Sequence, residues 1–86
     1  MKPKQYYFHT DPGHGWLAVK RNELVRLGIL DKISGFSYQR GETVYLEEDC
    51  DASIFLNTKE SFQEELKIKE TYRENTPIRN YSQFVA

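Results

Sequence analysis

Alternating apolar and polar positions predict two pairs of strands in the first half of the chain. Residues 36–39 and 43–47 are rich in β-forming side chains and flank a short stretch that contains Gly41, a pattern typical of a β-hairpin. Residues 5–10 and 16–19 alternate in the same way and are separated by a Pro-Gly segment that favours a tight turn. Strands are therefore the main element expected here.

Two short helices are predicted between and after these strands. Residues 22–29 carry Leu24 and Leu27 three positions apart, so both lie on one helical face. Gly28 then suits the left-handed position that commonly follows the last helical residue. Residues 52–57 predict the second helix, which begins after an acidic segment that offers N-cap side chains.

Residues 61–74 carry two conflicting patterns. Ser61 and Glu64 have the spacing of a capping box, which favours a helix start. Residues 66–72 alternate instead, and their Ile, Thr and Tyr side chains favour a strand, which is the interpretation we prefer. Residues 75–86 follow a break, and their apolar positions recur every third residue, which predicts a docked C-terminal tail.

Together these elements predict one α+β domain spanning residues 1–86. We expect a small antiparallel sheet of about four to five strands with two short helices, because 86 residues supply one hydrophobic core. The single cysteine, Cys50, cannot form an intramolecular disulfide, which is typical of a reducing compartment. No apolar stretch has the length of a signal peptide or membrane span, so a cytoplasmic protein without a membrane partner is expected.

The net charge of −1 hides an uneven distribution. Residues 42–65 contain eight acidic residues and one basic residue, whereas residues 1–41 and 66–86 both carry a basic excess. Phosphate binding requires a concentrated basic face. From this order of charges along the chain we expect no direct nucleic-acid binding.

The densest group of chemically versatile side chains is His9, Asp11 and His14. Two imidazoles and a carboxylate within six residues could hold a divalent metal such as zinc, manganese or iron, the one cofactor that the sequence suggests. Nothing in the spacing forces the three side chains to converge. The alternative, which we favour, is that Asp11 accepts turn amides while the histidines pack or face solvent.

A second candidate site lies at the end of the predicted hairpin. We expect it to contact a partner through an exposed tyrosine and the acidic run that follows, namely Tyr45, Glu47, Glu48, Asp49 and Asp51. The alternative, which we favour for the acidic run taken by itself, is that these carboxylates are a solvated strand end and helix caps.

Two strings carry a resemblance. His-Thr-Asp-Pro-Gly-His-Gly-Trp at residues 9–16 and Val-Tyr-Leu-Glu-Glu-Asp-Cys-Asp at residues 44–51 resemble small bacteriophage and mobile-element proteins that have no established activity. The likeness covers about residues 6–56. It implies a bacterial cytosol as the setting and a host protein as the partner, with inhibition of a host defence as one form.

These observations favour a non-catalytic interaction protein that binds a host protein. The alternative is a small metal-binding protein or metal-dependent enzyme that uses His9, Asp11 and His14. We rank binding above catalysis because a chain of this size has little material with which to enclose a deep pocket. The oligomeric state and the identity of any partner stay open.

Overall fold

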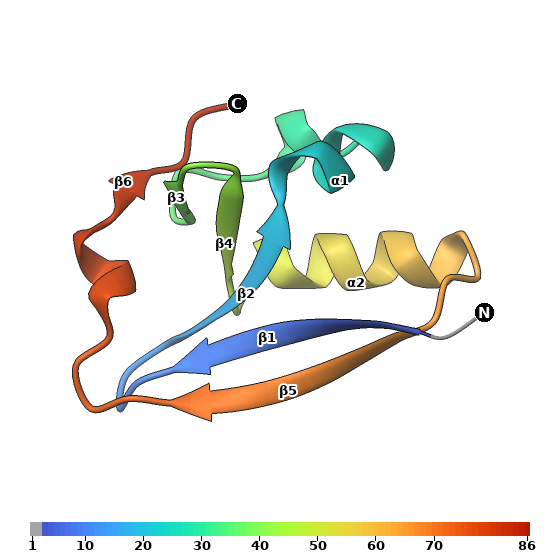
Figure 1. The fold of residues 1–86 in the computed structure, drawn as a ribbon. Helices are drawn as coiled ribbons and strands as arrows, with labels where there is room; N and C mark the ends of the chain where they lie inside the picture. The colour runs from blue at the N-terminus through green and yellow to red at the C-terminus, as the bar shows by residue number, and fades with distance from the viewer. Residues whose placement is uncertain (1–2) are drawn as a thin grey trace.

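One face of a mixed β-sheet is covered by two α-helices, and the other face carries no α-helix (Figure 1). The computed structural model describes residues 3–86. Within that range the elements are β1 (Lys4–Thr10), β2 (Gly15–Lys20), α1 (Arg21–Arg26), η1 (Leu30–Lys32), β3 (Tyr38–Arg40), β4 (Thr43–Glu47), α2 (Asp51–Ser61), β5 (Leu66–Tyr72), η2 (Pro77–Asn80) and β6 (Ser82–Gln83). The strand order is β5-β1-β2-β4-β3-β6.

The α+β class is confirmed, but the sheet is larger than predicted and is not wholly antiparallel. Six strands pair within residues 3–86, and β5 runs parallel to β1 while the other neighbours are antiparallel. The cause is α2, which carries the chain back along the sheet after β4, so that β5 starts at the same end as β4. The alternation in residues 66–72 predicted a strand, but it did not indicate which strand pairs with it or in which direction.

The first helix ends as Gly28 predicted. Gly28 has a φ of 73°, its N–H donates to the Val25 carbonyl, and the Ile29 N–H donates to the Leu24 carbonyl. These two hydrogen bonds form a Schellman motif, which satisfies carbonyls that the helix itself leaves free. The helix is shorter than the predicted 22–29, because residues 27–29 form this terminating turn.

The segment after α2 is a helix end, whereas its capping-box pattern pointed to a helix start. Gln63 has a φ of 57°, its N–H donates to the Glu60 carbonyl, and the Glu64 N–H donates to the Lys59 carbonyl. This is a second Schellman motif with glutamine in the position that usually holds glycine. The preferred interpretation of residues 66–72 as a strand is confirmed by β5.

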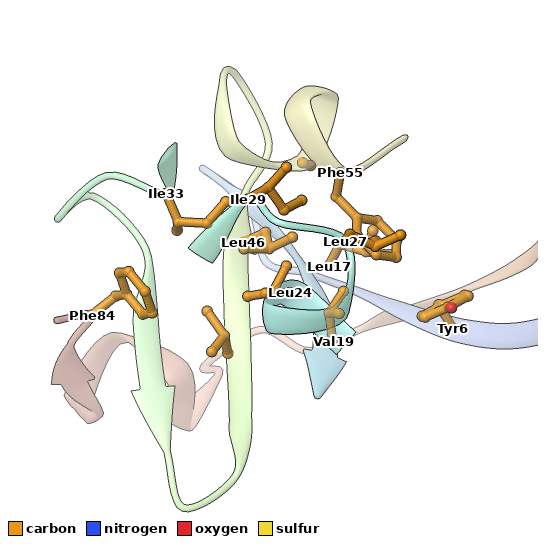
Figure 2. Packing of buried hydrophobic residues seen from close by; sticks show 12 residues of the cluster. Tyr6, Leu17, Val19, Leu24, Leu27, Ile29, Ile33, Leu46, Phe55 and Phe84 are labelled. Carbon is orange, nitrogen blue, oxygen red and sulfur yellow. The ribbon is translucent and has the colours of Figure 1, made fainter. Parts of the chain in front are cut away.

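The core lies between the helices and one side of the sheet (Figure 2). Tyr6 packs edge-on against Phe55 of α2, with ring centroids 5.3 Å apart. The buried cluster comprises Tyr6, Leu17, Val19, Leu24, Leu27, Ile29, Ile33, Val44, Leu46, Ala52, Phe55 and Phe84. Because side chains alternate along a strand, this packing directs the intervening residues of β1, β2 and β4 to the opposite face.

The chain crosses from one edge of the sheet to the other between β5 and β6. Residues 73–81 make this passage around the end of the strands, and η2 lies within it (Figure 1). Ile78 and Phe84 are buried, so the C-terminal segment packs on the body of the protein. No helix within residues 3–86 has the length and apolar character needed to cross a membrane.

Candidate binding surface

The face of the sheet that carries no helix, here called the open face, is lined by rings and basic side chains. The strand register places Tyr7 beside Ala18, Ala18 beside Tyr45, and Tyr45 beside Tyr38. On one side of this row the same face carries His9, Trp16 and Glu47. On the other side it carries Gln5, Lys20, Thr43 and Arg40. The edge strand β5 adds Lys67, Lys69 and Thr71 to this face. The period of two along each strand brings these residues together.

Four rings on this face form a continuous arc. The centroid distances are 6.4 Å from Tyr7 to His9, 6.0 Å from His9 to Tyr45, and 5.2 Å from Tyr45 to Tyr81. Tyr7 is 46% exposed, and the other three are partly exposed. Ala18, which is partly exposed, lies between Tyr7 and Tyr45 in the strand register. The arc therefore runs from β1 across the sheet to the C-terminal crossing.

The basic side chains around the arc have no acidic partner. Within residues 3–86 none of Lys20, Arg40, Lys67 and Lys69 forms an ion pair. Lys20 Nζ lies 3.3 Å from Thr43 Oγ1, and the Arg40 guanidinium lies 5.2 Å from the centre of the Tyr81 ring. The open face thus presents positive charge beside exposed aromatic surface.

The C-terminal crossing closes one end of the open face over Trp16. The Arg79 guanidinium lies 5.4 Å from the centre of the Trp16 ring, and the rings of His14 and Tyr38 lie 6.0 and 6.2 Å away. Trp16 is only 3% exposed as a result. The Asp11 carboxylate holds Arg79 in place through two hydrogen bonds. Arg79 Nη2 donates to Asp11 Oδ1 at 3.0 Å, and Arg79 Nε donates to Asp11 Oδ2.

The structure does not bring His9, Asp11 and His14 into one cluster. Asp11 accepts hydrogen bonds from the N–H groups of Gly13 and His14 as well as from Arg79. His9 Nδ1 lies 3.0 Å from Thr71 Oγ1, and His14 stacks toward Trp16. Within residues 3–86 no group of three His, Cys, Asp or Glu side chains is positioned to hold a metal ion. The metal site stays a prediction. In this structure the Asp11 carboxylate already accepts hydrogen bonds from Arg79 and from two backbone N–H groups.

The acidic run has mainly structural partners. Glu47 accepts hydrogen bonds from the N–H groups of Asp49, Cys50 and Asp51, and so caps the start of α2. Burial by itself would raise the pKa of Glu47, but these N–H groups outweigh it and hold that pKa below its usual value. Glu48 and Asp49 are exposed.

Asp51 was expected on a contact surface, but it is 1% exposed. Its Oδ2 accepts hydrogen bonds from the Ser34 N–H, the Ser34 hydroxyl and the Ser37 hydroxyl. It therefore cannot touch a partner in this fold. Of the predicted contact residues, only Tyr45 and Glu47 lie on the open face, and only Tyr45 contributes to its ring arc.

Sequence patterns gave no sign of a buried ionic network next to the core. Lys59 Nζ lies 3.0 Å from Glu23 Oε2 and 2.8 Å from Glu64 Oε1, and the Tyr6 hydroxyl donates to both Glu23 oxygens. The network borders a surface depression of about 950 Å³. Burial by itself would lower the pKa of Lys59, but its contacts with Glu64, Tyr6 and Glu23 outweigh it and raise that pKa. The network joins β1, α1 and the end of α2 beside the core.

No protein-family model matches the sequence, and no curated protein or solved structure matches it. The arrangement of side chains described above is therefore the basis for any statement about function.

The Asp11–Arg79 pair predicts a specific dependence of stability on pH. Arg79, together with the His14 and Gly13 N–H groups, holds the pKa of Asp11 well below its usual range, despite burial. Because the folded pKa lies below the unfolded value of about 4, the stabilising contribution is present above that value and is lost as pH falls below it. We expect the stability difference between the wild-type chain and Asp11→Asn to shrink between neutral pH and about pH 3.

Urea unfolding followed by the fluorescence of Trp16, the single tryptophan, measures this difference. Asp11→Asn should also shift the Trp16 emission to longer wavelength, because Arg79 covers the ring less firmly. A stability difference that is equal at both pH values would show that the pair does not couple to folding.

Proposed function

We propose that this chain is a non-catalytic interaction protein that contacts its partner through the open face. The observation that carries the proposal is the combination of the ring arc with basic side chains that have no acidic partner, on a face that no α-helix covers. Exposed tyrosines bury a large area with few rotatable bonds, so they contribute strongly to contacts with other molecules. The bacterial setting that the resemblance implies is part of the proposal.

The chemistry of the ionisable groups supports binding over catalysis. The carboxylate of Asp11 and the ammonium of Lys59 are both held in their charged forms by close partners of opposite charge. His9 Nδ1 lies within hydrogen-bond distance of Thr71 Oγ1, so this contact links β1 to the neighbouring strand β5. These groups are positioned for stability, whereas the open face has side chains that are still free to make contacts.

Site-specific photo-crosslinking in bacterial cells tests the proposal. A photo-reactive p-benzoylphenylalanine is placed at Tyr7 on the open face or at Phe62 at the end of α2, two positions that are 46% and 51% exposed. We expect defined adducts from position 7 at several times the yield from position 62, and we expect Tyr45→Ser in the same chain to reduce them. Equal yields at the two positions, or adducts that do not respond to Tyr45→Ser, would rule out the open face as the contact surface.

A further inference from the structure

We propose that the open face binds single-stranded nucleic acid, with bases stacked on its rings and phosphates placed against its basic side chains. This inference rests on the proposed function, because it names the partner of the same surface. It also revises the expectation from the sequence that no nucleic acid binds directly.

The rings have the arrangement that unpaired bases require. Tyr7 and Tyr45 flank Ala18 across three neighbouring strands, so their backbones stand about two strand spacings, or about 10 Å, apart. The His9 ring lies 6.4 Å from the Tyr7 ring and 6.0 Å from the Tyr45 ring, so it connects the two tyrosines. Flat bases stack on exposed aromatic rings of this kind when they are not already stacked in a duplex.

Two rings of the arc, those of His9 and Tyr45, are also uncharged near neutral pH. Burial lowers the pKa of His9 and Arg73 lowers it further, so the imidazole is neutral and acts as a flat ring. Burial raises the pKa of Tyr45, with Tyr81 adding to the effect, so the phenol stays protonated. Neither side chain places a negative charge in the path of a phosphate.

The fold separates charges that are mixed along the sequence. In β5, Lys67 and Lys69 point to the open face, whereas Glu70 alternates to the other side. The acidic stretch from residue 42 to 65 lies mostly in α2 and at its two ends, and α2 covers the opposite face of the sheet. Lys20 and Arg40 complete a basic border around the rings. The open face therefore carries four basic side chains without ion pairs and one carboxylate, that of Glu47 beside Trp16, although the net charge is −1.

Fluorescence anisotropy with labelled oligonucleotides measures the binding directly. The probes are a single-stranded RNA and a single-stranded DNA of about ten nucleotides, a DNA duplex of the same length, and inorganic polyphosphate as an unlabelled competitor. We expect both single strands to bind more tightly than the duplex, and polyphosphate to compete poorly because it has no bases. The Tyr7→Ala variant should weaken single-strand binding about tenfold.

The lysine contribution has a separate signature. The double variant Lys67→Ser/Lys69→Ser should reduce the slope of log affinity against log salt by about 1.4, because two phosphate contacts are lost. Lys32→Ser, which removes an exposed lysine of η1, and Phe62→Ser, which removes an exposed ring near α2, serve as controls and should change neither quantity. Far-ultraviolet circular dichroism of each variant verifies that it is folded.

Several results would overturn the inference. One is the absence of single-strand binding at low salt, and another is equal binding of duplex or equal competition by polyphosphate, which would indicate charge attraction alone. The adducts formed from position 7 provide the decisive comparison: nuclease should degrade them. Adducts that resist nuclease would overturn nucleic-acid binding and retain the proposed function with a protein partner, whereas the lack of any adduct specific to position 7 would remove both.

Discussion

Asp51→Ala should lower the free energy of unfolding by about 4 kcal/mol, because it leaves several buried donors without an acceptor. The Asp51 carboxylate is 1% exposed and accepts one backbone and two hydroxyl hydrogen bonds at distances of 2.5 to 3.0 Å. The Ser37 hydroxyl also accepts from the Glu47 N–H, so one carboxylate joins the end of β4, the start of α2 and the loop before β3. Losing it weakens three segments at once.

Asp49→Ala is the matched control, since Asp49 precedes the same helix but is exposed. It should change the free energy of unfolding by less than about 0.5 kcal/mol. Urea denaturation monitored by circular dichroism measures both variants. Equal losses for Asp49→Ala and Asp51→Ala would mean that general helix-terminus charge, and not the buried hydrogen bonds, stabilises this region.

Lys59→Met should lower the free energy of unfolding by about 3 kcal/mol. Methionine keeps most of the volume beside Tyr6 and Phe55, but it leaves the Glu23 carboxylate, 6% exposed, without its closest buried cation. Lys4, Arg26 and the Tyr6 hydroxyl still contact Glu23, so they limit the loss.

The double variant Glu23→Gln/Lys59→Met separates the loss of the ion pair from the cost of leaving the Glu23 carboxylate without Lys59. Removing both charges should recover part of the stability lost in Lys59→Met, because no uncompensated carboxylate stays buried. Denaturant unfolding of the wild-type chain, both single variants and the double variant gives the coupling free energy between the two side chains. A double variant whose loss equals the sum of the single losses would show that they act independently.

Local structure was the part of the fold that the sequence could predict. Gly28 marked the end of α1 because only a residue tolerant of positive φ fits a Schellman turn easily. Gln63 occupies the same position after α2, but glutamine does not announce a positive φ as glycine does. The spacing of Ser61 and Glu64 therefore suggested a helix start where the helix ends. The hairpin of β3 and β4 was predicted because its alternation and its turn glycine both act over a few residues.

Long-range pairings were beyond reach for a different reason. The parallel neighbour of β5 is decided by where α2 returns the chain, and no pattern within residues 66–72 encodes it. The buried positions of Asp51 and Lys59 depend on partners that come from other segments, such as Ser34 and Glu23. Composition alone favours exposed charges, so both were unexpected.

The candidate surface was partly visible in the sequence. Tyr45 was singled out from the sequence, whereas Tyr7 is found on the same face because it alternates with the buried Tyr6. The basic character of the open face was hidden, because it is assembled from single residues on separate strands.

The parallel contact between β1 and β5 has a consequence for how the protein is made. His9 and Thr71 are 62 positions apart, so β1 leaves the ribosome well before β5, the strand that pairs with its outer edge. Contacts so distant along the chain slow folding, since a long loop must close before they form. A nascent chain released before residue 72 would expose β1 as a bare edge, and such edges are where chains join one another into aggregates.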